Sequence, residues 1–113
     1  KLQDAELSIR KAIEINPNLL EAHSNLGNVL KDLGKLQEAE TSYRKAIKIK
    51  PDYAEAHSNL GGILSELGKL EEAEQSLLKS IELEPCFANV YWNLYGLSNS
   101  SLSKNNFALP NNA

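Results

Sequence analysis

An internal repeat constrains this chain more than any other feature of the sequence. Asparagine followed by leucine recurs at Asn25, Asn59 and Asn93, spaced 34 residues apart. Proline recurs with the same period, as Pro17, Pro51 and Pro85. When residues 20–53 are aligned with residues 54–87, more than half of the positions are identical. A period of this length predicts stacked helical units that pack against their neighbours, and it excludes a non-repeating globular fold.

Each full unit predicts two helices. In the first unit, apolar residues at helical spacing are followed by Gly34, a residue type that commonly ends helices. We expect the first helix over 18–33, with Asn18 and Glu21 as its capping pair. The second helix is expected over about 36–49, because a proline then ends it. The next unit repeats this scheme with Asp52, Glu55 and Gly68.

Glycine also recurs inside the first helix of each unit, as Gly27 and Gly61. A glycine there would weaken an isolated helix by about 1 kcal/mol, so its recurrence needs a reason. We interpret these glycines as the points at which the two helices of a unit cross, opposite Ala39 and Ala73. Small side chains at a crossing allow two backbones to approach closely.

The period, the small residues at the crossing and the closing proline resemble the tetratricopeptide repeat (TPR). This resemblance implies an all-α fold, an α-solenoid of antiparallel helix pairs with about six helices and an irregular C-terminal tail. Within a TPR array over 1–98, it divides the chain into a half repeat, two full repeats and the first helix of a terminal repeat, at 1–19, 20–53, 54–87 and 88–98. Because the chain begins in mid-repeat, we expect it to belong to a longer array.

The C-terminal end departs from the pattern. Tyr95 stands where the earlier units have the crossing glycine, and residues 99–113 are rich in Asn and Ser. Two interpretations of these last residues stay open: a disordered tail, or a segment folded back on the last helix. An apolar cluster near this end suggests a homo-oligomer as an alternative assembly. Its members are Tyr91, Trp92, Tyr95 and Leu97.

The first helices of such a solenoid line its concave groove, which is the surface that repeat proteins use for binding. A carboxamide both donates and accepts hydrogen bonds, so a ladder of Asn25, Asn59 and Asn93 is suited to hold the backbone of an extended peptide. The alternative is that these residues hold neighbouring repeats in register. The array is similar to the superhelical arm of O-linked N-acetylglucosamine transferases, and this resemblance implies the peptide-binding role. Further groove candidates are Asn28, Ser24 and Ser58.

Composition and spacing argue against other functions. The chain has 12 Lys and Arg against 15 Asp and Glu, a net charge of −3, which disfavours nucleic acid as the main partner. No apolar run approaches the roughly 20 residues of a membrane helix. His23 and His57 lack nearby ligands for a metal, and we expect them to pack against neighbouring residues. Cys86 is the only cysteine, so the default expectation is a cytoplasmic location.

The sequence therefore predicts a protein interaction module rather than an enzyme, with no cofactor and a protein or peptide as partner. Two alternatives remain beside a peptide-binding groove: a substrate-recruiting arm of a larger enzyme such as a glycosyltransferase, and a self-associating scaffold. The TPR subgroup that grips acidic C-terminal tails needs Arg and several Lys on its first helices. Here Arg is absent from those helices and Lys31 is the one lysine in both, so binding of such tails is not expected.

Overall fold

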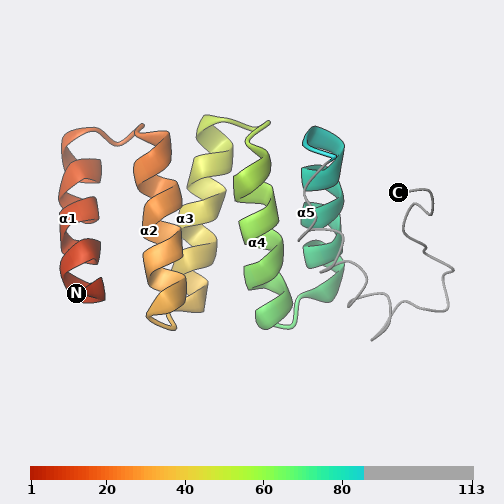
Figure 1. Ribbon diagram of the computed structural model, residues 1–113, viewed down its shortest axis with the longest axis horizontal. Coiled ribbons are helices and arrows are strands. Elements are labelled where there is room, and N and C mark those ends of the chain that lie inside the picture. Colours follow the sequence, from red (N-terminus) through yellow and green to blue (C-terminus); the bar gives the residue numbers. More distant parts are fainter. Residues whose placement is uncertain (86–113) are drawn as a thin grey trace, which may run out of the picture.

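Apolar residues at helical spacing form five α-helices in the computed structural model of this chain, which describes residues 1–85 (Figure 1). The helices stand side by side along the longest axis of the view in Figure 1. In chain order they are α1 (Leu2–Ile15), α2 (Leu20–Asp32), α3 (Leu36–Ile49), α4 (Ala54–Glu66) and α5 (Leu70–Leu83). The expected sixth helix, 88–98, and the tail, 99–113, lie outside the described residues.

The ends of α2 and α4 confirm the role predicted for two glycines. Gly34 and Gly68 have φ values of 83° and 84°, a left-handed conformation that side chains other than glycine rarely adopt. In the first of these turns, the N–H of Lys35 donates to the carbonyl of Leu30 at 2.8 Å. This bond pattern is the Schellman motif, which satisfies carbonyl groups left over at a helix end.

The beginnings of α2 and α4 correct the predicted capping pairs. The N-cap residues are Leu19 and Tyr53, neither of which makes a side-chain capping bond, so Asn18 and Asp52 are not caps. A histidine on the first turn of each helix holds the preceding loop instead. Nε2 of His23 donates to the carbonyl of Pro17 at 2.7 Å, and His57 makes the equivalent bond to Pro51 at 2.8 Å.

The glycines inside α2 and α4 lie where the two helices of a unit approach most closely. A Cβ atom added at Gly27 would lie 2.5 Å from Cε1 of Tyr43, and one added at Gly61 would lie 2.6 Å from Cγ of Leu77. The close approach is therefore confirmed. The atoms nearest to the added Cβ belong to the side chains of Tyr43 and Leu77, and at Gly61 the carbonyl of Ala73 is 3.3 Å away. The predicted Ala39 and Ala73 are both fully buried in the same core.

The second helices of the units form one layer, which ion pairs join along its length. Arg10 of α1 contacts Glu38 of α3 at 3.0 Å, and one repeat later Arg44 of α3 contacts Glu72 at the start of α5 at 3.3 Å. The apolar side of α2 is buried beneath this layer: Leu30 is 1% exposed. The opposite side of α2 and the corresponding side of α4 face away from it.

Candidate functional site

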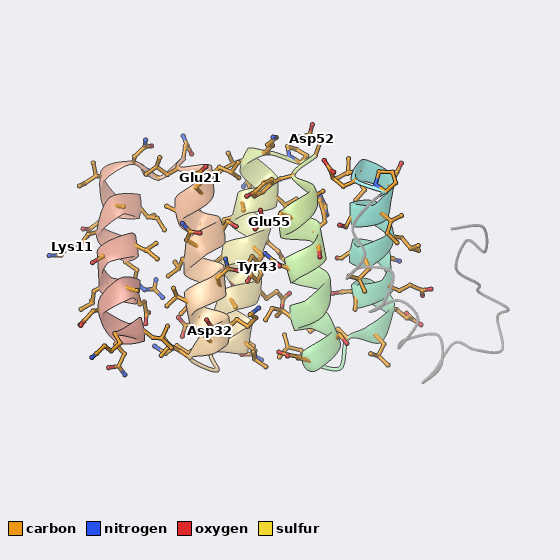
Figure 2. The ribbon with its side chains drawn as sticks, in the orientation of Figure 1. Lys11, Glu21, Asp32, Tyr43, Asp52 and Glu55 are labelled. Carbon is orange, nitrogen blue, oxygen red and sulfur yellow. The ribbon has the colours of Figure 1, made fainter. Side chains whose placement is uncertain are left out.

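Four polar side chains form one stripe along α2, on the side opposite its buried leucines. They are separated by four, three and four residues, a spacing that puts them on one face of a helix. Glu21, Asn25 and Asp32 are exposed and Asn28 is half-buried. Figure 2 labels Glu21 near one end of the helix and Asp32 near the other. We call Glu21, Asn25, Asn28 and Asp32 the α2 stripe.

The same positions on α4 form an equivalent surface, which we call the α4 stripe. It consists of Glu55, Asn59, Gly62 and Glu66. The two glutamates are exposed, and Asn59 and Gly62 are half-buried. The two repeats therefore present matching rows, except that the third position is asparagine in one and glycine in the other.

Two tyrosines lie between the stripes and show that the stripes are close to one another. Burial raises the pKa of Tyr43 far above its ordinary value, and the negative charges of Asp32 and Glu55 raise it further. One carboxylate from each stripe therefore acts on this phenol, and Figure 2 shows Tyr43 between Glu55 and Asp32. Tyr53 likewise feels Glu55 and Glu21, and its hydroxyl donates to Oε1 of Glu55 at 3.1 Å.

The asparagine side chains on the stripes differ in their partners. Within residues 1–85, the carboxamides of Asn25 and Asn59 make no hydrogen bond to another residue. By contrast, Oδ1 of Asn28 accepts a hydrogen bond from the hydroxyl of Tyr43 at 2.6 Å. Two of the predicted groove residues thus present unpartnered donors and acceptors, and the third is held by a buried side chain.

The two serines predicted for the groove lie elsewhere. Ser24 and Ser58 are 3% and 6% exposed, so they have almost no surface for a ligand in this structure. Helical spacing alone did not reveal this, because a serine at the edge of a polar stripe looks the same in sequence whether or not the next repeat covers it.

The remaining predicted site residues lie outside the described residues. They are Asn93, the third member of the ladder, and the predicted self-association cluster of Tyr91, Trp92, Tyr95 and Leu97.

Charge pairing separates the two faces of the molecule. Glu6 and Glu40, on the layer of second helices, each contact an arginine of the same helix at 2.9 Å and a lysine of the next repeat at 3.3 Å. In contrast, the stripe carboxylates of Glu21, Asp32 and Glu66 form no ion pair within the described part of the chain. These three stripe carboxylates therefore carry negative charge that no described basic side chain pairs with.

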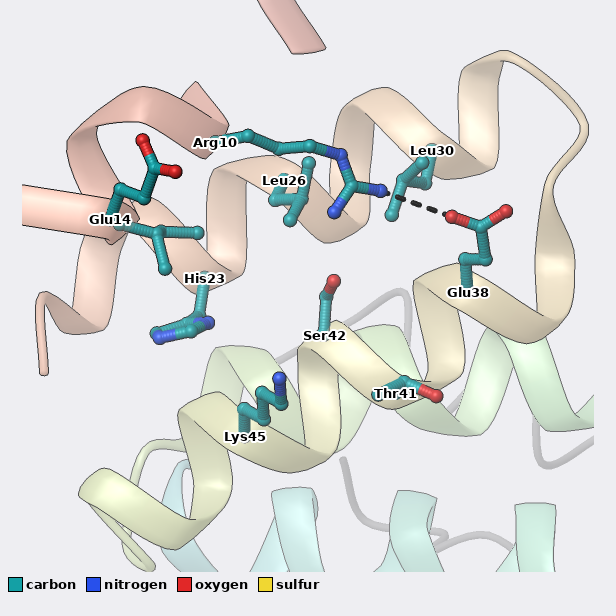
Figure 3. Close-up of a pocket in the computed structure, with 10 residues that line it drawn as sticks. Arg10, Glu14, His23, Leu26, Leu30, Glu38, Thr41, Ser42 and Lys45 are labelled. Carbon is teal, nitrogen blue, oxygen red and sulfur yellow. Dashed lines mark hydrogen bonds and ion pairs between the residues drawn. The ribbon is translucent and has the colours of Figure 1, made fainter. Parts of the chain in front are cut away.

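A pocket that the sequence did not predict lies on the other face, between α1 and α3 (Figure 3). Its volume is about 270 Å³. Arg10 and Lys45 extend over it from the two helices, and His23 of α2 is at one end. Nδ1 of His23 is buried without a hydrogen-bond partner. No sequence motif could have indicated this pocket. Its lining residues come from three helices, and they do not recur at a regular spacing in the sequence.

No group of three or more His, Cys, Asp or Glu side chains among residues 1–85 is arranged to hold a metal ion. None of the helices described is both long enough and apolar enough to cross a membrane.

Comparison with protein-family models identifies the repeats. A model described as TPR repeat matches residues 27–67, and two models described as tetratricopeptide repeat match residues 9–41 and 54–85. Together these matches extend from the middle of α1 to the end of α5. No curated protein sequence matches this chain significantly.

Several solved structures share the fold. The first TPR domain of Spaghetti (RPAP3), bound to the HSP90 peptide SRMEEVD, has a TM-score of 0.86 and 26% identity, covering 88% of this chain and 79% of that one. An O-GlcNAc transferase mutant from Thermobaculum terrenum has a TM-score of 0.82 and 29% identity, covering 89% of this chain and 20% of that one. MamA, with a TM-score of 0.86 and 24% identity, is covered over 61% of its length and shares the fold alone.

The sequence period, the glycines at the helix crossings, the paired-helix architecture and the family matches all point to the same repeat. This chain belongs to the tetratricopeptide repeat proteins.

Proposed function

We propose that this chain is a protein interaction module that binds an extended polypeptide across the α2 and α4 stripes. Asn25 and Asn59 would hold the main chain of the bound peptide, each through one donor and one acceptor of its carboxamide. Such contacts do not depend on the side chains of the peptide. Asn28, on the same stripe as Asn25, adds a third contact.

The observation that carries this proposal is that, among the described residues 1–85, the carboxamides of Asn25 and Asn59 have no hydrogen-bond partner. If these residues held neighbouring repeats in register, each would have a hydrogen bond to another helix or loop. Such side chains, recurring one repeat apart on the same face, are suited to an external partner. Their two-sided hydrogen bonding matches a peptide backbone, which offers alternating donors and acceptors.

Similarity to RPAP3 supports a peptide as the class of ligand, because that TPR domain is bound to the peptide SRMEEVD. The acidic side chains of that peptide do not suit the surface described here. Glu21, Asp32, Glu55 and Glu66 would face them, with Lys31 as the one lysine on α2. We therefore propose peptides without an acidic C-terminus.

Selection from a displayed library of random linear peptides tests the proposal. The immobilised chain should enrich a set of peptides, and the double variant Asn25→Ala/Asn59→Ala should bind a synthetic copy of an enriched peptide at least about tenfold more weakly, as expected for the loss of more than one hydrogen bond. Isothermal titration calorimetry measures this affinity.

The matched control is Gln3→Ala/Gln37→Ala. These two exposed carboxamides are also one repeat apart, but they lie on α1 and α3, in the layer of second helices. This variant should bind the peptide like the unmodified chain. Equal losses in both double variants, or no enrichment by the unmodified chain, would refute peptide binding at the stripes.

A second candidate function, a substrate-recruiting arm of a larger enzyme, is favoured by the 29% identity with the O-GlcNAc transferase, of which this chain spans 20%. This function would use the same surface, but the bound polypeptide would be the substrate of an attached catalytic domain. Fusion of this chain to the catalytic part of such a transferase, in place of its own repeats, tests it. Transfer to peptides that this chain enriches is the expected result, and unchanged substrate choice would contradict it.

A further inference from the structure

The contact between Tyr43 and Asn28 depends on the absence of a side chain at Gly27. A side chain at Gly27 would collide with the Tyr43 ring, since its Cβ would lie 2.5 Å from Cε1 and 2.9 Å from Cζ. With glycine there, the ring of α3 lies against the backbone of α2 and is fully buried. Its hydroxyl reaches Oδ1 of Asn28, the next residue along α2, at 2.6 Å.

This bond determines what Asn28 can offer to a ligand. The tyrosine hydroxyl has one hydrogen, and here it donates this hydrogen to the carboxamide oxygen of Asn28. Both hydrogens on Nδ2 then remain, and Asn28 is half-buried on the α2 stripe, so that part of it contacts solvent. Burial raises the pKa of Tyr43, so the hydroxyl keeps its proton throughout the pH range in which proteins work.

The second repeat has a different arrangement at the same place. Leu77 replaces the tyrosine and Gly62 replaces the asparagine. A Cβ atom built at Gly62 would have no atom of residues 1–85 within 4 Å, so open space lies above this part of α4 within the described chain. The remaining positions of the two stripes match in polar character, so this pair of positions distinguishes the two repeats.

We infer that Tyr43 is a positioning residue that makes Asn28 a donor toward a main-chain carbonyl of the bound polypeptide, while the space at Gly62 receives one of its side chains. This inference rests on the proposed peptide binding and adds to it that the two repeats contact the peptide differently. Asn25 and Asn59 can each donate or accept with unoccupied groups, whereas Asn28 offers chiefly its two N–H donors, because its oxygen already accepts from Tyr43.

Two substitutions test the donor role with a fluorescein-labelled synthetic copy of a peptide enriched by the unmodified chain. Asn28→Asp keeps an oxygen that accepts the Tyr43 hydroxyl but removes both N–H donors. We expect about tenfold weaker binding by fluorescence anisotropy, with an unchanged far-ultraviolet circular dichroism spectrum. Tyr43→Phe keeps the ring and removes the hydroxyl, and should weaken binding about threefold or more because Nδ2 is no longer held toward the peptide.

Controls distinguish this role from a change in charge or stability. Gln37→Glu also replaces an exposed carboxamide by a carboxylate, but on α3, and should leave peptide affinity unchanged. Gly62→Asn should weaken binding by filling the open space. In a ¹⁵N-edited spectrum of the folded chain, the side-chain NH₂ signals of Asn28, identified by their loss in Asn28→Asp, should shift on addition of the peptide.

The outcomes separate the two proposals. If the unmodified chain enriches no peptide, the proposed function fails. If it binds a peptide and Asn28→Asp binds equally well, or the Asn28 NH₂ signals do not move, the donor role is overturned while peptide binding stands. If Tyr43→Phe lowers thermal stability without changing affinity, Tyr43 is a packing residue and not a positioning one.

Discussion

Neighbouring glycines on α4 have opposite roles, which only the three-dimensional packing reveals. At Gly61, an added Cβ would lie 2.6 Å from two atoms of Leu77, which is fully buried and cannot move aside. At Gly62, the next residue, the same atom would meet nothing within 4 Å. The sequence predicted the close approach at Gly61 from its recurrence with Gly27, but it had no signal for the space at Gly62.

We expect Gly61→Ala and Gly62→Ala to change the free energy of unfolding in opposite directions. The first should lower it, because overpacking costs about 1–3 kcal/mol and outweighs the helix propensity gained. The second should raise it by up to about 1 kcal/mol, since alanine is the better helix former and no collision results. Urea denaturation followed by circular dichroism measures both, and equal effects would contradict the placement of these glycines.

The helix beginnings show where residue-level prediction failed. The sequence pattern of Asn18 with Glu21 is typical of a capping box. In the structure the N-cap is Leu19, one residue later in the sequence, and His23 of the first turn bonds to the carbonyl of Pro17 in the preceding loop. A capping pattern identifies a helix start only locally. The bond from an imidazole to a proline carbonyl six residues earlier depends on how the loop between α1 and α2 folds, which residue types alone do not specify.

The layer of second helices is held by a repeating arrangement of ion pairs. Bonding to Arg10 lowers the pKa of Glu6 below the usual value of 4.5. Burial would raise the pKa of Glu40, but bonds from Arg44 and Lys69 more than offset it, so that pKa is lowered as well. The arrangement does not continue into α5, where Leu78 takes the place of the arginine and is exposed.

These lowered pKa values predict how stability depends on pH. The folded chain holds fewer protons on Glu6 and Glu40 than the unfolded chain, so their contribution is fully present above about pH 4.5 and is lost as the pH falls through the lowered values. Glu40→Gln should therefore flatten the acidic decline of the unfolding free energy. Glu71→Gln, at an exposed glutamate that forms no ion pair in residues 1–85, should leave the decline unchanged. An identical decline in both variants would contradict this account.

Among the described helices, α1 and α4 differ most in burial. α1 has no buried residue, and Leu7 is 62% exposed, whereas seven residues of α4 are buried. We expect amide hydrogens of α1 to exchange with solvent much faster than those of α4, because local opening of α1 exposes little apolar surface. Hydrogen exchange followed by NMR measures this, and equal protection of the two helices would refute it.

At the scale of the whole molecule, the stripe face carries negative charge without paired cations. Within residues 1–85, the carboxylates of Glu6 and Glu40 on the other face are paired, while those of Glu21 and Asp32 are not. We expect the peptide SRMEEVD, which is bound by the RPAP3 domain, to show no saturable binding to this chain in anisotropy titrations at moderate salt. The double variant Glu21→Gln/Asp32→Asn should gain measurable affinity for it. Tight binding by the unmodified chain would show that charge does not select its peptides.

The repeat period made much of this architecture predictable. Because equivalent residues recur one repeat apart, the order of α2 to α5, the ends of α2 and α4 at glycines and the common face of Asn25 and Asn59 follow from sequence. The contact from Tyr43 to Asn28 does not, since it joins two helices and requires a glycine between them. The burial of Ser24 was also missed, because a serine at the edge of a polar stripe looks the same in sequence whether it is buried or exposed.

The most direct test of the central claim is an NMR titration of the ¹⁵N-labelled chain with a peptide enriched from the displayed library. The account predicts that the side-chain NH₂ signals of Asn25 and Asn59 shift and saturate together, while those of Gln3 and Gln37 on the other face stay in place. Saturating shifts confined to Gln3 and Gln37, with Asn25 and Asn59 unmoved, would contradict it.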